Sequence, residues 1–239
     1  MHTIGLSKQY RRDHHALHAT NVSIERGDFV GIVGSSGAGK TTFLKCLNGM
    51  IRPTSGQVFF EQIDTEVMSK RTLRRNISMI FQQSNLVPQL TAYENVLIGR
   101  LGYMSGWRSV VPLFKKSDKL KALEALDRVG LIDFSITKCK FLSGGQQQRV
   151  AIARALAQEA KVLLADEPVA SLDPENALNV MTLLKTINSK DKVTILANLH
   201  QLDLARKFSN SLIGFRKGTI IFNGKTEAFG EFEYNHLFI

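Results

Sequence analysis

The sequence contains no run of 18 or more apolar residues, so we expect no helix that spans a membrane. Its N-terminus, MHTIGLSKQYRR, lacks the apolar stretch and the small-residue cleavage site of a secretory signal, and we expect no such signal. The two cysteines, Cys46 and Cys139, lie far apart and form no CxxC or Cys/His group. This spacing argues against a zinc site and predicts two free thiols in a reducing compartment.

The overall composition is that of an ordinary soluble globular protein. Of the 239 residues, 44% are hydrophobic and 22% are charged, and this length allows a full core. The net charge of +10 would suit nucleic acid or the anionic surface of a membrane. However, the basic residues occur in small scattered groups without interleaved aromatic residues that could stack on bases. We therefore interpret the charge as general surface charge and expect no nucleic-acid partner.

Apolar segments typical of strands alternate with helical patterns along the chain. The helical patterns are residues 41–48, closed by Gly49, residues 118–129, capped by Ser117 and closed by Gly130, and residues 146–158 and 175–188. Strands that alternate with helices predict an α/β core with a mostly parallel sheet. The strand-like segments are residues 29–33, 58–60, 77–81, 162–165, 193–197, 211–215 and 219–222.

The middle of the chain differs from its two ends. Residues 84–158 contain few β-branched runs and follow helical patterns, which predicts an α-helical subdomain inserted into the core. We expect a single domain over residues 1–239, with its α/β core formed by residues 1–83 and 159–239. The tail from 212 to 224 has turn signals at Lys217-Gly218 and Asn223-Gly224, which predict terminal strands at an edge of the sheet.

Residues 34–41, GSSGAGKT, match the P-loop pattern G-x-x-x-x-G-K-[ST] and lie between an apolar strand and a helix. The glycines let successive backbone N–H groups point inward and form a nest around a β-phosphate. Lys40 would reach the β- and γ-phosphates, Thr41 would offer its hydroxyl to Mg²⁺, and Thr42 would hydrogen-bond phosphate. This predicts a P-loop NTPase (RecA-like) core whose phosphate-binding residues are Gly34, Ser35, Ser36, Gly37, Ala38, Gly39, Lys40, Thr41 and Thr42.

A second motif, VLLADEP at residues 162–168, places two carboxylates at the end of a fully apolar strand. Ligands of open α/β sheets bind at the carboxyl ends of the strands. Asp166 would orient Mg²⁺ through its water shell, and Glu167 would polarise the attacking water as a general base. Alone, the motif is an ordinary junction of a strand and a turn. Together with the P-loop, it indicates a site where a nucleoside triphosphate is hydrolysed.

A third motif, LSGGQ at residues 142–146, opens a helical pattern. Ser143 and Gln146 have the spacing of a capping box. A cap does not explain Gly144 and Gly145, because a glycine within a helix costs about 1 kcal/mol relative to alanine. Two glycines at a helix N-terminus do give an anion close access to its N–H groups and partial positive charge. The sequence therefore predicts a second phosphate-binding site.

These three motifs together resemble the ATP-binding cassette (ABC) family, in which LSGGQ is the signature sequence, and the resemblance covers nearly the whole chain. It implies an ATP hydrolase that uses ATP and Mg²⁺ and works as two copies packed head to tail. The signature of one copy, from Ser143 to Gln146, would close over the γ-phosphate of the ATP on the partner's P-loop. The second phosphate site would thus serve the neighbour's nucleotide.

Three further residues match family motifs by position. Gln82 matches the Q-loop glutamine, which contacts Mg²⁺ and senses the transporter, and Gln83 is the alternative register. His200 matches the switch histidine, which contacts the γ-phosphate. Tyr10 matches the aromatic residue that stacks on adenine. The resemblance thus implies that Gln82 and His200 act in catalysis with Lys40 and Glu167.

The segment Ser171-Leu172-Asp173 matches the D-loop, which crosses the dimer interface in the family. The residues also have plainer interpretations: Asp173 and Pro174 suit the first positions of a helix, and His200 could cap one.

Members of this family perform different work, so the fold leaves the task open. A nucleic-acid machine would usually interrupt the cassette with a long coiled coil or a zinc module, and residues 83–142 contain neither heptads nor a Cys/His cluster. The favoured alternative is the motor subunit of a membrane transporter. Its partners would be separate permease chains, a second copy of itself and, indirectly, a solute-binding protein. It would lie peripherally on the cytoplasmic face of the plasma membrane.

Three stretches resemble the phosphonate-import branch of the family: FQQSNLVPQLT at 81–91, GRLGYMSGWR at 99–108 and NLHQLD at 198–203. This similarity implies import of phosphonate, phosphite or a phosphate ester. Import of another small solute such as methionine is the alternative. The aromatic residues Tyr103, Trp107 and Phe114 would form either a docking surface for the permease or a small core of the helical subdomain.

Overall fold

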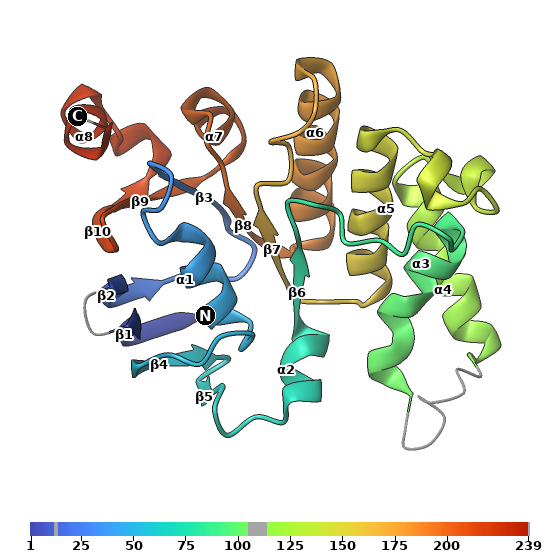
Figure 1. Ribbon diagram of the computed structural model, residues 1–239, viewed down its shortest axis with the longest axis horizontal. Helices are drawn as coiled ribbons and strands as arrows, with labels where there is room; N and C mark the ends of the chain where they lie inside the picture. The colour runs from blue at the N-terminus through green and yellow to red at the C-terminus, as the bar shows by residue number, and fades with distance from the viewer. Residues whose placement is uncertain (12–13, 105–113, 239) are drawn as a thin grey trace.

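The structure is a computed structural model that describes residues 1–11, 14–104 and 114–238 (Figure 1). Its centre is a six-stranded sheet in the order β10-β9-β3-β8-β7-β6, in which only β10 runs antiparallel to its neighbour. The strands are β3 (Phe29–Gly34), β6 (Ile77–Ile80), β7 (Val162–Asp166), β8 (Thr194–Asn198), β9 (Ser211–Arg216) and β10 (Thr219–Lys225). The predicted parallel core and antiparallel edge strand are therefore confirmed.

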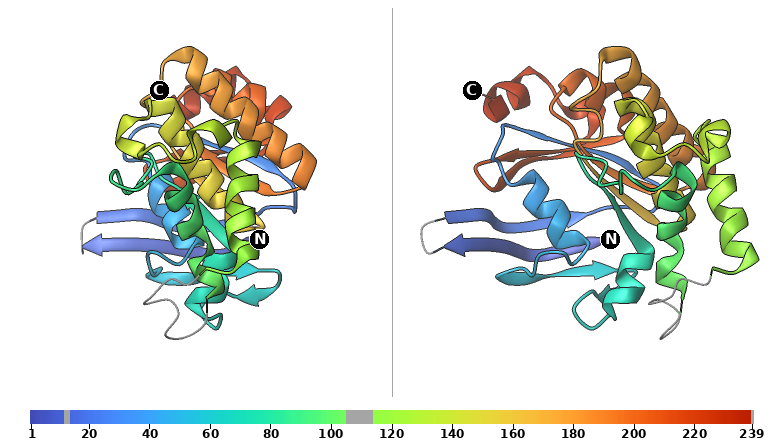
Figure 2. Two further views of the ribbon diagram at one scale, coloured as in Figure 1. Left: turned by 90° about the vertical axis from the view of Figure 1, so that its right-hand side faces the viewer. Right: turned by 45° about the vertical axis from the view of Figure 1, so that its right-hand side comes forward.

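The inner strands are buried along their whole length. Every residue of β3, β7 and β8 is buried, which explains why these segments are continuous apolar runs rather than alternating ones. Helices cover both faces of the sheet (Figures 1 and 2). They are α1 (Lys40–Leu47), α2 (Lys70–Asn76), α6 (Pro174–Asp191), α7 (Leu202–Phe208) and α8 (Glu231–Phe238).

A second, antiparallel sheet has the order β2-β1-β4-β5 and was only partly predicted. Its strands are β1 (His2–Arg11), β2 (His14–Ser23), β4 (Ser55–Phe60) and β5 (Ile63–Asp64). Of these four strands, the sequence predicted only the buried end of β4, residues 58–60. Strands β1 and β2 were missed because their pairing shifts register at several points, which breaks the apolar alternation that marks a half-buried strand.

Helix α1 packs between the two sheets. Phe43 on α1 and Phe215 on β9 are both fully buried, with ring centroids 5.3 Å apart. Leu6 and Leu17, from β1 and β2, belong to the same hydrophobic cluster. The helix that follows the P-loop is therefore held on both sides, and this fixes the loop at its N-terminus.

Of the residues described between β6 and β7, most beyond residue 91 are helical, as predicted. This part contains the helices α3 (Ala92–Ile98), α4 (Lys116–Arg128) and α5 (Gly144–Ala157), and the 3₁₀ segments Gly99–Tyr103, Ile132–Phe134 and Cys139–Phe141. Elsewhere in the chain, a 3₁₀ turn at Thr226–Ala228 precedes α8. In Figures 1 and 2, α3 and α4 lie away from the central sheet, and α5 leads back to it. The division at residues 84 and 158 stays our proposal.

The predicted helix ends need one correction. Ser117 does not cap α4, because the helix already begins at Lys116 with Lys115 as its N-cap. The carboxylate of Asp118 accepts a hydrogen bond from the Lys115 backbone N–H at 3.3 Å, so the acidic side chain satisfies the helix start. The predicted closures are confirmed, since Gly49 and Gly130 have φ angles of 68° and 69°.

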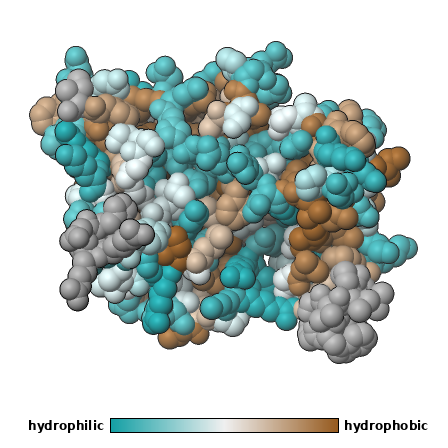
Figure 3. Space-filling view, in the orientation of Figure 1, coloured by the Kyte–Doolittle hydropathy of each residue, from teal (hydrophilic) through white to brown (hydrophobic). Residues whose placement is uncertain are grey.

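The surface is mixed, with apolar atoms gathered over the helical part (Figure 3). Exposed apolar side chains between α4 and α5 include Ile136 and Phe141. Among the residues that the structure describes, no helix is long and apolar enough to cross a membrane.

Candidate functional site

The predicted P-loop joins β3 to α1 in a conformation that requires glycine. Gly34 has a φ of 144°, and a Cβ there would lie 2.1 Å from the carbonyl oxygen of Phe215. No side chain fits at that distance, so β9 can approach the loop only because residue 34 is glycine. The loop then turns into α1, whose first N–H groups are free to bind an anion.

Lys40 points into the P-loop and is only 4% exposed. Its ammonium donates hydrogen bonds to the carbonyl oxygens of Gly34, at 2.7 Å, and Ser35, at 2.9 Å. Burial lowers the pKa of Lys40, and the nearby carboxylates of Glu167 and Asp166 partly oppose this shift. A buried cation satisfied only by neutral carbonyls is well placed to bind phosphate oxygens, which carry negative charge.

Asp166 and Thr41 meet at the end of β7. The hydroxyl of Thr41 donates to Asp166 Oδ1 at 2.8 Å, and Asp166 is 7% exposed. A hydroxyl and a carboxylate beside a phosphate cradle are the oxygen ligands that Mg²⁺ prefers. The same Oδ1 accepts a second hydrogen bond, from Asn198 Nδ2 at 2.8 Å. Asn198 was not among the predicted site residues.

Glu167 and His200 also lie together. Glu167 Oε1 is 2.6 Å from His200 Nε2. These two residues follow the ends of neighbouring strands, where Asp166 and Asn198 are in contact although they are 32 positions apart in the sequence. Glu167 has a φ of 53°, a left-handed conformation that is uncommon for a residue with a side chain. Such strain costs about 1–3 kcal/mol and is concentrated at functional sites. The backbone here turns the carboxylate out of the strand and toward His200.

The signature segment forms the predicted capping box at the start of α5. Ser143 Oγ accepts from the Gln146 N–H at 3.3 Å, and the Ser143 N–H donates to Gln146 Oε1 at 2.9 Å. The two glycines differ. A Cβ on Gly145 would lie 2.8 Å from Asn176 Oδ1, so close packing against α6 explains this glycine, whereas Gly144 is exposed. Anion access thus stays a predicted role for Gly144 alone.

Comparison with known proteins identifies the family. Residues 17–170, which make up well over half of the chain, match the model of the ABC transporter family. The chain belongs to the ABC transporter family.

Several curated relatives cover almost the whole ABC chain. The phosphonates import ATP-binding protein PhnC of Staphylococcus saprophyticus is 46% identical over 237 residues, which is 97% of this chain and 91% of the relative. PhnC 2 of Oceanobacillus iheyensis is 46% identical over 222 residues, with 92% and 87% of the two chains covered. The fold and the P-loop are therefore those of a cassette ATPase.

Solved ABC structures agree with this fold. A dimeric structure of the ATP-binding cassette MJ0796 in a post-hydrolysis state, bound to ADP and Pi, has a TM-score of 0.79 and 35% identity. The matched region covers 94% of this chain and 98% of the MJ0796 chain. A nucleotide-free cassette from an ABC transporter has a TM-score of 0.85 and 27% identity. That match covers 99% of this chain and 93% of the cassette's chain.

The predicted Q-loop, signature helix and D-loop line one groove of about 420 Å³. Gln82 and Gln83 are both exposed and both line it, so the choice between them stays a prediction. Ser171 and Gly144 belong to the same wall. The fold therefore brings together three motifs that are far apart in the sequence.

Asp173 caps α6, which confirms the plainer interpretation of this residue. Its side chain accepts from the Asn176 N–H at 3.1 Å, and the Asn176 amide donates to it at 2.6 Å. These hydrogen bonds lower the pKa of Asp173. Its predicted contact across a dimer is compatible with this role, because the carboxylate lies at the surface.

Tyr10 is 51% exposed on β1, and the ammonium of Lys8 lies 5.4 Å from its ring centroid. The neighbouring strand β2 is connected to the P-loop: His18 N–H donates to Gly218 O at 2.9 Å, and Gly218 N–H donates to Ala38 O at 3.0 Å. The hairpin that carries Tyr10 thus lies beside the nucleotide loop. Stacking of Tyr10 on adenine stays a prediction.

The aromatic segment of the helical part is divided. The ring of Tyr103 lies between Arg75 and Arg100, whose guanidinium carbons are 4.0 Å and 3.8 Å from its centroid. Phe114 is half-buried against the main core cluster. For these two residues the structure supports a small core rather than a docking surface. Trp107 lies outside the described residues.

Proposed function

We propose that this protein is the ATP-hydrolysing subunit of a membrane importer for phosphonate or a related phosphorus oxyanion, such as phosphite or a phosphate ester. The similarity to PhnC proteins supports the cargo, because these relatives are named for phosphonate import. The observation that carries the enzymatic part is the grouping of Lys40, the Thr41–Asp166 pair and the Glu167–His200 pair at one edge of the sheet.

Mg²⁺ fits the residues of this edge. Thr41 and Asp166 would hold it with Gln82, since a hydroxyl, a carboxylate and an amide oxygen are suitable ligands. The ion would neutralise charge on the phosphate oxygens. Lys40 would exchange its loop carbonyls for phosphate oxygens, with Ser35, Ser36, Gly37 and Thr42 completing the cradle.

Glu167 would act as the general base that orients and deprotonates the attacking water. Its contact with His200 at 2.6 Å keeps the carboxylate at the edge of the sheet, and His200 would contact the γ-phosphate when nucleotide is bound. Such a base contributes about 10²–10⁴-fold to the rate.

Two copies would form the complete site. The signature helix α5 begins with the exposed Ser143 and Gly144, which leaves a helix N-terminus accessible to a phosphate on a second chain. The dimeric form of the related MJ0796 cassette supports this arrangement. Closure on two ATP molecules would then supply the mechanical work, because the binding energy is realised only in the closed state.

A groove between the core and the helical part is suited to the permease. It has a volume of about 750 Å³, and its lining includes the apolar residues Met79 and Leu101. The lining also contains five cations and no acidic side chain; the cations are Lys70, Arg71, Arg74, Arg75 and Arg154. We propose that a cytoplasmic segment of the permease docks here with acidic residues, which would place the protein peripherally on the cytoplasmic face of the membrane.

The test is reconstitution of the protein with its permease in liposomes, with the solute-binding protein inside. We expect ATP hydrolysis to be stimulated by binding protein loaded with phosphonate, phosphite or a phosphate ester. The Glu167→Gln variant is the control for hydrolysis by another enzyme. Stimulation by methionine but by no phosphorus compound would disprove the proposed cargo while leaving the ATPase assignment intact.

A further inference from the structure

Asn198 occupies a position that the known motifs do not explain. It is the last residue of β8 and is 1% exposed. In the parallel pairing of β7 with β8 it lies directly opposite Asp166. Side chains at paired positions of neighbouring strands point to the same face of a sheet, so the two are brought into contact by the backbone itself.

The amide of Asn198 has only one satisfied end. Nδ2 donates to Asp166 Oδ1 at 2.8 Å, while Oδ1 of Asn198 has no hydrogen-bond partner among the described residues. Rotating the amide would not help, because its oxygen would then face the carboxylate of Asp166, which can only accept. The orientation is therefore set by Asp166, and the unpaired oxygen is the cost of holding it. A buried unpaired group in a native structure calls for such an explanation.

We propose that Asn198 is a positioning residue that fixes the carboxylate of Asp166 for Mg²⁺·ATP. Thr41 Oγ1 and Asn198 Nδ2 both donate to Oδ1, which restricts rotation of the carboxylate, and Oδ2 would remain available to the ion or its water shell. This inference rests on the proposed role of Asp166 in holding Mg²⁺. It adds a residue that acts on the ligand without touching the nucleotide.

The main test is Asn198→Leu, which keeps the size of the side chain but removes both the donor and the unpaired oxygen. We expect the Mg²⁺ concentration for half-maximal hydrolysis to rise at least about tenfold, the effect usually seen when a partner of a metal ligand is lost. Mg²⁺-dependent binding of a fluorescent ATP analogue, measured in a Glu167→Gln background, should shift by the same factor. The melting temperature in EDTA should change little, because Asp166 keeps the Thr41 hydroxyl as a donor and the loss of its bond to Asn198 is offset by removal of the unpaired buried acceptor.

Asn188 provides a matched control. It is also a buried asparagine, but its Nδ2 donates to the carbonyl oxygens of Gly27 and Val193, both at 2.8 Å, away from the P-loop. Asn188→Leu should lower the melting temperature and leave the Mg²⁺ requirement unchanged. A residue with a purely structural role at position 198 would behave in the same way.

The outcomes separate the two proposals. A Mg²⁺ requirement within twofold of wild type in Asn198→Leu, or in Asn198→Ala should the leucine variant fail to fold, overturns the positioning role. If Asp166→Asn raises the requirement and the Asn198 variants do not, only the inference about Asn198 is lost. If Asp166→Asn itself changes nothing, both the metal role and this inference are wrong.

Discussion

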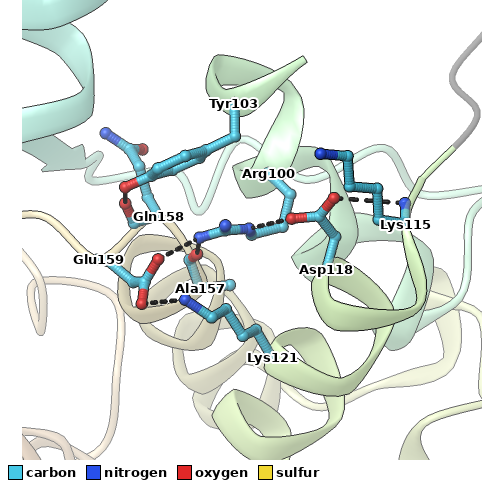
Figure 4. Close-up of polar contacts among 8 residues, drawn as sticks. All are labelled: Arg100, Tyr103, Lys115, Asp118, Lys121, Ala157, Gln158 and Glu159. Atoms are coloured by element: carbon cyan, nitrogen blue, oxygen red, sulfur yellow. Dashed lines mark hydrogen bonds and ion pairs between the residues drawn. The ribbon is translucent and has the colours of Figure 1, made fainter.

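The ion pair between Arg100 and Asp118 gives the most quantitative prediction about stability. Their side chains are 5% and 9% exposed, and Arg100 Nε donates to Asp118 Oδ1 at 2.9 Å (Figure 4). Arg100 Nη1 also donates to Ala157 O at 2.8 Å and to Glu159 at 2.7 Å. A single side chain thus connects the segment after α3 with α4 and the end of α5.

The variant Arg100→Met keeps most of the side-chain volume and removes the charge. Asp118 would remain buried, with the Lys115 N–H at 3.3 Å as its remaining donor among the described residues. Breaking a buried pair in this way costs about 3–5 kcal/mol. Glu159 adds little to this cost, because it is half-exposed and keeps its contact with Lys121. For a chain of this size the loss corresponds to a melting temperature lower by about 6–20 °C.

Thermal and urea denaturation followed by circular dichroism would measure this loss. The control is Arg52→Met, which removes an ion pair with Glu66 whose side chains are 83% and 51% exposed and should cost about 0–1 kcal/mol. Arg100→Met combined with Asp118→Leu should recover more than half of the loss, because no unpaired charge remains. A shift for Arg100→Met no larger than that of the control would refute the reasoning.

Three further predictions concern the site. Glu167→Gln should bind ATP but hydrolyse it at least about 100-fold more slowly, and wild-type turnover would remove Glu167 as the base. Neither Lys40→Ala nor Ser143→Arg should hydrolyse ATP alone, whereas their mixture should regain activity through one intact shared site; normal hydrolysis by either single variant contradicts site sharing. Burial raises the pKa of the Cys46 thiol to about 11, so iodoacetamide at pH 8 should label this residue only after unfolding.

The strands of the central sheet could be predicted because burial on both faces leaves a direct mark in the sequence. Residues 29–33 and 162–165 are continuous apolar runs, and both proved to be buried throughout. Strands β1 and β2 left no such mark, since each has one solvated face and an interrupted register. The start of α4 was misplaced for a related reason: its cap is a contact made by Asp118 three residues later.

The site shows the same contrast. Roles for Lys40 and Glu167 could be proposed from the sequence, because short motifs indicate them within a few residues. Asn198 could not, because an asparagine at the end of an apolar strand has no meaning until the strand beside it is known. A polar residue at the carboxyl end of a buried strand was the one signal available.

The amino-acid sequence by itself determined the buried strands of the central sheet, the phosphate loop and the family, because hydrophobic periodicity and short motifs act over neighbouring residues. Only the tertiary structure decided which side chains meet: Thr41 with Asp166, Glu167 with His200, and Asn198 with Asp166. These pairs depend on the order β3-β8-β7 in the sheet. That order follows from how helices and strands pack together over the whole chain, and no local pattern contains it.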